Sequence, residues 1–348
     1  MFVIETDTMI IYPVSFNQYI KKLNDYSVNV SSESDESDIG QKADRNILLP
    51  SGILMSDGDV QEIHEELRRY SPDRTIVIDF QGVKIKDCKN FGVLVSEEAN
   101  RVILSNLSRE TGVFDKAVKD LNVPFEEQDG IRGIIYSNSE VREWAEQNEK
   151  ATELSEVYSN HIAALVSGCM KSDGKPRQFQ ESSCVFSNKY VNIKDIFRRP
   201  LDARFLLYRL ALKVRDIGGP IGSYKLICTS KTGAILANII SKMIDVPVVY
   251  CVGMGPRFAV RPDEIVEVVQ ENEHYVYIFD FISLGTELKI LSTFISDKKS
   301  KLIGGVGPAS YIHCNHEEIV KRKLILSKMH PLINIQDYKE IDYKIEIP

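Results

Sequence analysis

The feature that most constrains the fold is a short run near residue 280, in which an apolar strand ends at an acid and turns into a helix. The run reads VYIFDFISLGTEL and covers residues 276–288. Residues 276–279 are predicted as the strand, Asp280 as its carboxyl end, and residues 288–295 as the start of the helix. Backbone N–H groups of such a turn and of the helix N-terminus converge on an anion. The predicted ligand contacts are therefore Asp280 and the turn residues Ser283, Leu284, Gly285 and Thr286.

A second segment of the same kind lies at residues 226–250, LICTSKTGAILANIISKMIDVPVVY. Its apolar residues recur at helical spacing after a turn, which predicts a strand, a turn, a helix and a second strand. In a parallel α/β sheet, ligands bind outside the carboxyl ends of the strands. Lys231, in this turn, is therefore the first candidate for a ligand contact, and Thr232 and Gly233 follow it.

Together these segments resemble the type I phosphoribosyltransferases. Four residues match the diphosphoribose-binding signature of that family: Asp280, Ser283, Gly285 and Leu288. Residues 186–194, FSNKYVNIK, are similar to the segment that opens orotate phosphoribosyltransferases and lies over the base, and a predicted helix at 202–216 follows it. The resemblance covers roughly residues 155–348 and implies a parallel sheet flanked by helices.

The resemblance also implies roles for individual residues. Lys231 would meet the pyrophosphate of phosphoribosyl diphosphate (PRPP), and Asp280 would hold the ribose hydroxyls or a Mg²⁺ cofactor. Two positions depart from the family pattern. Phe279 replaces the first acid, and Glu287 stands where the family has a hydroxyl against the 5′-phosphate. A carboxylate beside a phosphate is unfavourable unless it points away or the ligand carries less charge.

The resemblance also implies a mobile loop, rich in basic residues, that closes over the pyrophosphate. This chain lacks most of those basic residues. The corresponding residues 251–258 contain one arginine, Arg257. Arg257, Lys189 and Ser230 are weaker candidates for ligand contacts. Pyrophosphate leaving groups are stabilised by positioned positive charge and metal ions, so the missing charge favours binding without ordinary turnover. If the protein is active, catalysis is assigned to Asp280.

The first 150 residues carry a different α/β pattern. A β-branched strand at 75–80 follows a helix at 59–70, and the alternation ends with a helix at 139–148 that is capped by Ser137 or Ser139. Residues 76–94 resemble the STAS domain of anti-sigma-factor antagonists, over roughly residues 46–149, which implies a protein partner. Cys88 and Lys89 occupy the places of its phosphorylatable serine, so a phosphoswitch is not predicted.

The predicted fold class is α/β, with a STAS-like domain at residues 1–150 and a phosphoribosyltransferase-like domain at residues 151–348. Residues 2–13 are expected to form a hairpin that pairs onto the first sheet, and the acidic stretch 30–41 to be a flexible loop. One helix is expected to run through 143–157 as a connector between the domains. The stretch 171–181, KSDGKPRQFQE, is expected to be mobile because Gly174 and Pro176 break regular structure.

Composition excludes some classes of function. The net charge is −7 and basic residues are dispersed, so composition does not indicate a nucleic-acid surface, although a locally basic face is not excluded. No apolar run reaches the ~18–20 residues that span a bilayer, and the start lacks the basic region of a secretory signal, so we expect a cytoplasmic protein. The six cysteines show no pair at metal-ligand spacing. The cluster His313, Cys314 and His316 is interpreted as a strand end and helix cap.

Three functions are compatible with these observations. The first, which we favour, is a regulator or effector that binds a phosphorylated ribose ligand, a nucleotide or PRPP, and couples it to protein partners through the STAS-like domain, as in prokaryotic signalling or defence. The second is an active phosphoribosyltransferase, or a related ribosyl-transfer enzyme of altered substrate. The third is an assembly scaffold in which Gly233 and Gly285 only make tight turns. The resemblance also implies a homodimer.

Overall fold

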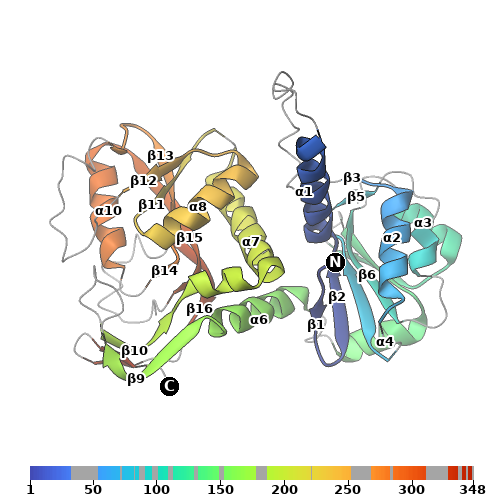
Figure 1. Cartoon of the computed structure of the whole chain (residues 1–348). Helices are drawn as coiled ribbons and strands as arrows, with labels where there is room; N and C mark the ends of the chain where they lie inside the picture. Colours follow the sequence, from blue (N-terminus) through green and yellow to red (C-terminus); the bar gives the residue numbers. More distant parts are fainter. Residues whose placement is uncertain are drawn as a thin grey trace. The chain divides into compact units, whose positions relative to one another are not determined.

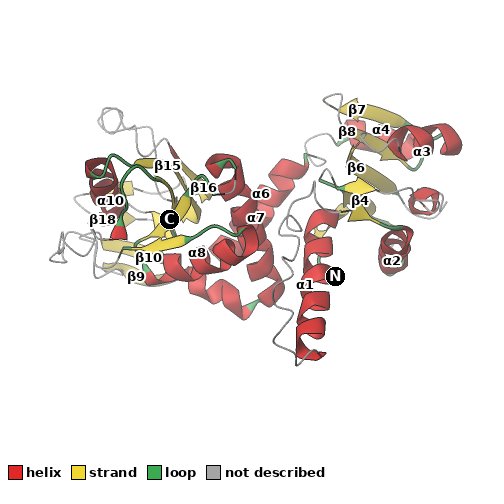
Figure 2. Cartoon of the chain, turned by 90° about the horizontal axis from the view of Figure 1, so that it is seen from above, coloured by secondary structure: helices red, strands yellow, loops and turns green. Residues whose placement is uncertain are grey.

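The computed structural model describes most of the chain as two compact units, Met1–Leu154 and Ser155–Pro348. The described residues are 1–32, 54–70, 73–81, 83–85, 91–95, 101–108, 113–128, 132–148, 153–177, 186–220, 222–251, 268–282, 285–310, 328–335, 339–341 and 344–346. In each unit the strands form a layer between helices, and both large sheets contain parallel strands (Figures 1 and 2). The fold is therefore mixed α/β.

The N-terminal unit is built on a six-stranded sheet of order β1-β2-β4-β6-β8-β7. Its strands are β1 (Ile4–Glu5), β2 (Met9–Pro13), β4 (Thr75–Asp79), β6 (Val102–Ser108), β7 (Phe125–Gln128) and β8 (Arg132–Tyr136). β1 and β2 pair antiparallel, and β2 pairs with β4, which confirms the expected hairpin on this sheet. β2, β4 and β6 are parallel, and β8 pairs antiparallel with both β6 and β7.

Helices cover both faces of this sheet (Figure 1). α2 (Asp57–Leu67), the 3-10 turn η4 (Phe91–Leu94) and α3 (Val113–Leu121) pack against one face, where Ile78, Phe80, Leu104, Ile63 and Phe114 form part of a buried core. α1 (Val14–Ser32) contacts β2 and β4, and α4 (Ser139–Gln147) contacts β8. A short parallel pair, β3 (Leu54–Met55) and β5 (Lys84–Ile85), completes the described elements of this unit.

The C-terminal unit contains a second six-stranded sheet, in which every pairing is parallel. Its strands are β11 (Lys225–Cys228), β12 (Val248–Tyr250), β13 (His274–Ile278), β14 (Phe281–Ile282), β15 (Lys301–Ser310) and β16 (Met329–Asn334). β11 lies between β12 and β13, and the elements at 225–250 confirm the predicted strand, turn, helix and strand. Because all strands are parallel, their carboxyl ends meet at one edge, which we call the carboxyl edge.

Three long helices flank this sheet. α7 (Pro200–Gly218) and α8 (Lys231–Ile244) contact β13 on one side, and α8 also contacts β11 and β12. α10 (Thr286–Asp297) covers the other face. Its residues Leu288 and Leu291 pack with Tyr275, Tyr277 and Phe279. These three aromatic residues occupy every second position from β13 onward, so their side chains point to the same face. α10 begins two residues before the predicted start at 288. Figure 1 shows α10 and α8 on opposite sides of the strands.

A smaller four-stranded sheet of order β17-β18-β10-β9 belongs to the same unit. It consists of β9 (Met170–Arg177), β10 (Phe186–Val191), β17 (Lys339–Ile341) and β18 (Lys344–Glu346), with α6 (Leu154–Ser167) before it and η5 (Ile193–Arg198) after β10. The expectation of a mobile stretch from 171 is wrong as far as 177, because β9 pairs antiparallel with β10. β9 is an edge strand, and edge strands tolerate glycine and proline.

Two further expectations are wrong at the end of the first unit. The helix at 143–157 is not continuous, because α4 ends at Gln147 with Asn148 as its C-cap and α6 begins at Leu154. The N-cap of α4 is Asn138, not Ser137 or Ser139, since its Oδ1 accepts a hydrogen bond of 2.9 Å from the backbone N–H of Val141. The flexible loop expected at 30–41 is wrong at residues 30–32, because they belong to α1 (Val14–Ser32). Residues 33–41, Cys88, Lys89 and the 313–316 cluster lie outside the described residues.

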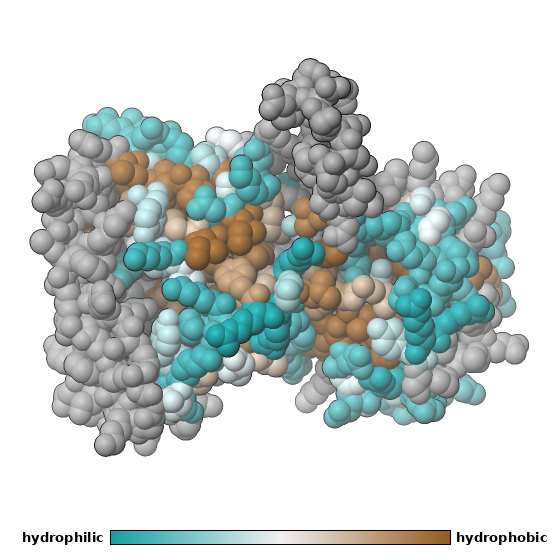
Figure 3. Space-filling view, viewed as in Figure 1, coloured by the Kyte–Doolittle hydropathy of each residue, from teal (hydrophilic) through white to brown (hydrophobic). Residues whose placement is uncertain are grey.

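The surface of α8 carries apolar side chains. Ile235 is 44% exposed on this helix, and Figure 3 shows apolar residues gathered where α8 lies in Figure 1.

Within the described ranges, no helix is both long enough and apolar enough to cross a membrane.

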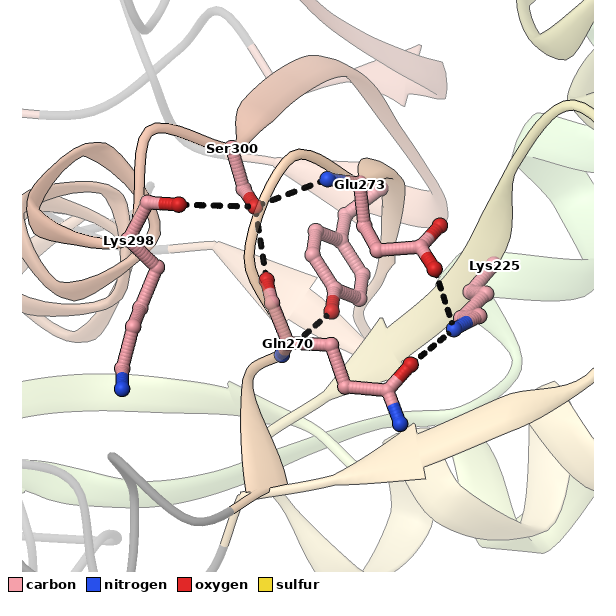
Figure 4. A network of polar contacts seen from close by, with 6 residues as sticks. Lys225, Gln270, Glu273, Lys298 and Ser300 are labelled. Atoms are coloured by element: carbon pink, nitrogen blue, oxygen red, sulfur yellow. Dashed lines mark hydrogen bonds and ion pairs between the residues drawn. The ribbon is translucent and has the colours of Figure 1, made fainter.

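The amino ends of β11 and β13 are joined by a polar network (Figure 4). Lys225 Nζ donates to Glu273 Oε1 at 2.8 Å and also to the Gln270 side chain. Ser300 Oγ accepts from the backbone N–H of Glu273 at 2.9 Å and donates to the carbonyl oxygen of Gln270 at 2.7 Å. This network lies at the edge of the sheet opposite to the carboxyl edge. It stabilises the strands at a distance from the predicted ligand contacts.

Candidate functional site

The candidate site lies where β11 and β13, which are neighbours in the sheet, reach the carboxyl edge. β11 ends at Cys228, and the chain turns through Thr229 and Ser230 into α8. β13 ends at Ile278, and Asp280 follows it. The parallel register brings these two turns together although about fifty residues separate them in the sequence.

Ser230 links the two turns. Its side chain is the N-cap of α8, where Oγ accepts a hydrogen bond of 2.8 Å from the backbone N–H of Gly233. The same Oγ donates its proton to Asp280 Oδ1 at 3.0 Å. One hydroxyl therefore fixes the N-terminus of α8 and the carboxylate after β13 in a single arrangement. Ser230, a weaker prediction, has a positioning role here.

The carboxylate of Asp280 is held among hydrogen-bond donors. Burial raises the pKa of Asp280, while hydrogen bonds from Ser230, from the backbone N–H groups of Asp280 and Phe281, and from the Thr232 side chain act in the opposite direction. Thr232 itself is buried in the first turn of α8. The structure thus brings Asp280, Ser230 and Thr232 together.

The two predicted glycines are each required by geometry. A Cβ atom at Gly233 would lie 2.9 Å from Ser230 Oγ and 3.0 Å from the carbonyl oxygen of Ile278, so the absent side chain lets α8 approach β13 closely. Gly285 is the N-cap of α10 and has φ 67°, a left-handed conformation that glycine adopts without strain. Both positions shape the backbone of the turns.

Lys231 is the first residue of α8 and its side chain is exposed. Among the described residues, its ammonium group has no hydrogen-bond or ion-pair partner. The N-terminus of a helix carries partial positive charge, so a lysine there is disfavoured by about 0.3–1 kcal/mol unless an anion binds nearby. An anion bound at the carboxyl edge, beside the turn that contains Ser230, would lie next to this lysine.

A buried chain of hydroxyl groups runs behind these turns. Thr229 Oγ1 lies 2.8 Å from Tyr277 Oη and donates to Glu287 Oε2 at 3.0 Å. The threonine hydroxyl has one proton, which goes to the carboxylate, so Tyr277 must donate to Thr229. Burial, followed by the charge of Glu287, raises the pKa of Tyr277 and keeps it protonated. The side chain of Glu287 is thus directed to Thr229.

This chain was not predicted from the sequence. Glu287 was identified only as a departure from the family pattern, and Thr229 and Tyr277 had no assigned role. Thr229 and Glu287 are 58 positions apart. The available signal was the alternation along the strand, which places Tyr277 on the face that α10 covers.

β10 contributes a tyrosine near Asp280. The pKa of Tyr190 is raised by burial and further by the charges of Asp280 and Asp195, so its phenol lies within electrostatic range of the carboxyl edge. Lys189, the neighbouring residue on β10, is half-buried. Within the segment predicted to lie over the ligand, Tyr190 is the residue that sequence reasoning did not single out.

Within the described residues, no preformed magnesium site surrounds Asp280. That carboxylate accepts hydrogen bonds from Ser230, Thr232 and backbone N–H groups. Within the described ranges, no group of three or more His, Cys, Asp or Glu residues could hold a metal ion. Mg²⁺ is commonly bound through one or two carboxylates together with ligand phosphates.

Three predicted contacts lie outside the described residues, namely Ser283, Leu284 and Arg257. Thr286 is the first residue of α10.

The N-terminal unit has a separate polar cluster at the carboxyl ends of β4 and β6. Asp79 is buried, and its Oδ1 accepts from Asn106 Nδ2 at 2.7 Å and from the backbone N–H of Gln81 at 3.2 Å. Ser15, at the start of α1, donates to the Gln81 side chain. These hydrogen bonds join α1 to the two strands, so the cluster supports the fold of this unit.

Comparisons with known proteins do not assign a family. No known protein family and no curated protein sequence matches the chain, so nothing there supports the STAS-like interpretation. Similar solved structures include adenine phosphoribosyltransferase from Thermoanaerobacter pseudethanolicus, with 10% identity and a TM-score of 0.37 over 50% of this chain and 99% of that chain. Orotate phosphoribosyltransferase from Aeropyrum pernix has 13% identity and a TM-score of 0.35 over 49% and 92%. Leishmania donovani UMP synthase has 12% identity and a TM-score of 0.38 over 82% and 55%. Values this low establish neither family nor function.

Proposed function

We propose that the C-terminal unit binds a phosphorylated ribose ligand, such as a nucleotide or PRPP, at the carboxyl edge between β11 and β13. The observation that carries the proposal is Lys231, an exposed cation at the N-terminus of α8 beside the turn fixed by Ser230. A phosphate there would meet both the lysine charge and the helix N-terminus. The sugar hydroxyls would lie toward Asp280, whose oxygens already accept hydrogen bonds.

Binding without ordinary turnover is favoured over catalysis. Phe279 replaces an acid, and Asp280 is committed to Ser230 and Thr232. Stabilising a departing pyrophosphate requires positioned positive charge, and Lys231 is the cation that the described part of the site offers. We therefore propose a regulator or effector, and an active ribosyl-transfer enzyme is the second candidate.

The coupling of this site to protein partners is a further part of the proposal. It rests on the STAS-like sequence of residues 76–94, within a unit that has its own sheet and core. A homodimer is proposed from the family resemblance, and the apolar surface around Ile235 on α8 is compatible with it. A signalling or defence role in prokaryotes belongs to the same proposal.

The test is a thermal-shift titration with PRPP and a panel of nucleotides, with and without magnesium, on the wild type and Lys231→Ala. A ligand at a hundred times its dissociation constant adds about 2.7 kcal/mol to the native state. We expect a shift in the wild type that is lost in Lys231→Ala but kept in Lys242→Ala, at the other end of α8. If no ligand shifts the wild type, the scaffold function replaces the proposal.

Turnover is tested separately. Consumption of PRPP by the wild type that is abolished in Asp280→Asn would establish the enzyme alternative. Binding of PRPP without consumption, by a protein whose Lys231→Ala variant no longer binds, supports the regulator.

A further inference from the structure

The carboxylate that follows β13 has its hydrogen-bonding capacity filled by the chain itself. Asp280 accepts from the hydroxyl of Ser230 at 3.0 Å, from the Thr232 side chain, and from the backbone N–H groups of Asp280 and Phe281. A carboxylate has about four acceptor positions. Four donors therefore occupy Asp280 without a ligand, although part of the residue is exposed and a ligand can lie against it.

A sugar hydroxyl could donate to Asp280 only by displacing one of these donors. Thr232 is 7% exposed, so its displaced hydroxyl would be left unpaired and away from water. Displacing Ser230 would break the hydrogen bond that joins the N-terminus of α8 to the end of β13. The favourable energy of a new hydrogen bond is thus offset by the loss of an existing one.

The neighbouring side chain at the end of β13 points into the core. Phe279 is 1% exposed, and its ring centroid lies 5.7 Å from that of Tyr277. The same ring covers Gly307 of β15, where an added Cβ atom would lie 2.2 Å from Phe279 Cδ2. Neither Phe279 nor Asp280 is therefore available to bind a sugar hydroxyl.

A charge and a helix terminus remain for a ligand at these turns. Lys231 is exposed at the start of α8, and among the described residues its ammonium group has no partner. Both features attract a phosphate, whatever group the phosphate is attached to. The two turns at the ends of β11 and β13 therefore favour recognition of the phosphate over recognition of the sugar.

We propose that the site recognises its ligand by the phosphate and independently of the sugar hydroxyls, and that Asp280 is a positioning residue, which holds the turn before α8 through Ser230. The inference rests on the proposed function and specifies its ligand class. Ribose and 2-deoxyribose phosphates bind alike, and so do ribonucleotides and deoxyribonucleotides. The ligand class is therefore wider than derivatives of ribose.

The experiment compares two pairs of ligands whose members share a phosphate and differ in their sugar hydroxyls. The pairs are ribose 5-phosphate with 2-deoxyribose 5-phosphate, and AMP with 2′,3′-dideoxy-AMP. Dissociation constants are measured by titration calorimetry on the full-length protein. We expect the members of each pair to differ by less than about threefold in the wild type, because a hydrogen bond to the charged carboxylate would strengthen binding about tenfold or more.

Variants test the positioning role. Asp280→Asn replaces an acceptor oxygen by a donor, and Ser230→Ala removes the hydroxyl that joins the two turns. Each should weaken binding of both members of a pair by the same factor, and the double variant should bind no more weakly than the weaker single variant, because both changes break one connection. Ser230→Thr keeps the hydroxyl and the N-cap and should retain the affinity. Asp297→Asn removes the same charge at the exposed end of α10 and should bind as the wild type does.

The outcomes separate the inference from the proposed function. If the wild type prefers the hydroxyl-bearing member of either pair by more than about threefold, or if Asp280→Asn weakens that member alone, the inference is overturned while Lys231-dependent binding still supports the function. Additive effects of Asp280→Asn and Ser230→Ala would also overturn the positioning role. If no sugar phosphate and no nucleotide binds the wild type, the function fails and the inference with it. The wild-type comparison remains decisive if Asp280→Asn does not fold.

Discussion

Replacing Gly233 by alanine tests whether the close approach of α8 to β13 depends on this glycine. The added Cβ would lie 2.9 Å from Ser230 Oγ and 3.0 Å from the carbonyl oxygen of Ile278. Ser230 cannot move away without weakening its hydrogen bonds to the Gly233 N–H and to Asp280. The carbonyl of Ile278 belongs to the last residue of a strand that is paired on both sides. The helix must therefore shift.

The magnitude follows from opposing contributions. Overpacking of this kind costs about 1–3 kcal/mol, and loss of the N-cap hydrogen bond costs about 1 kcal/mol. Alanine is favoured over glycine within a helix by about 1 kcal/mol. The net expectation is a loss of about 1–3 kcal/mol in the free energy of unfolding of the C-terminal unit. Without the close contact, the same substitution would increase the free energy of unfolding. The sign of the measured change therefore shows whether α8 depends on this glycine to approach β13.

The assay is urea unfolding followed by circular dichroism. The single tryptophan, Trp144, lies on α4, so its fluorescence follows the N-terminal unit separately. Gly58→Ala is the matched control, because a Cβ at this glycine of α2 would be an ordinary 3.7 Å from Ser56 Oγ. We expect Gly58→Ala to be neutral or to stabilise its unit by up to about 1 kcal/mol. A Gly233→Ala protein as stable as the wild type, or more stable, would refute the reasoning.

Two other substitutions give distinct expectations. Thr229→Val removes the hydroxyl that accepts from buried Tyr277 and donates to Glu287, so the free energy of unfolding measured in urea should fall by about 1–3 kcal/mol. Thr229→Ser keeps the hydroxyl and should retain most of the stability. A valine variant as stable as the wild type would contradict the hydrogen-bond chain. Burial lowers the pKa of His161, although the charge of Asp202 acts in the opposite direction. The unfolded state therefore binds the proton more readily than the folded state. As a result, the free energy of unfolding should decrease as pH falls below about 6.5. His161→Phe, which can pack against Phe205, should reduce this pH dependence in unfolding titrations between pH 5 and 8, and an unchanged slope would exclude His161 as its source.

The sequence predicted the parallel layer of the C-terminal unit because its signals are local. Apolar strands, a turn with Ser230 and a helix with regular apolar spacing lie within 25 residues, and the observed elements follow that order. The edge strand β9 could not be recognised, because its glycine and proline predict a break and only pairing with β10 makes it a strand. α1 was overlooked although Phe16, Tyr19 and Leu23 follow a helical period.

The site was predictable residue by residue but not in its connections. Lys231, Gly233 and Asp280 stand at strand ends, where α/β sheets place ligands, so position alone identifies them as candidates. The link between Ser230 and Asp280, and that between Thr229 and Glu287, join turns from different strands and depend on sheet order. The resemblance implied that residues 186–194 lie over a ligand, but it did not single out Tyr190, whose pKa is raised by burial and by the charge of Asp280 although β10 belongs to another sheet.

The hydroxyl chain behind the site has a spectroscopic consequence. The protons of Tyr277 and Thr229 are each held between two oxygen atoms and screened from water. Hydroxyl protons on the surface exchange with solvent too fast to be observed, whereas protons enclosed in this way exchange slowly enough to give separate proton resonances. The carboxyl edge therefore contains its own reporters. Their chemical shifts register any change in the charge or position of Glu287, without a label and without a substitution.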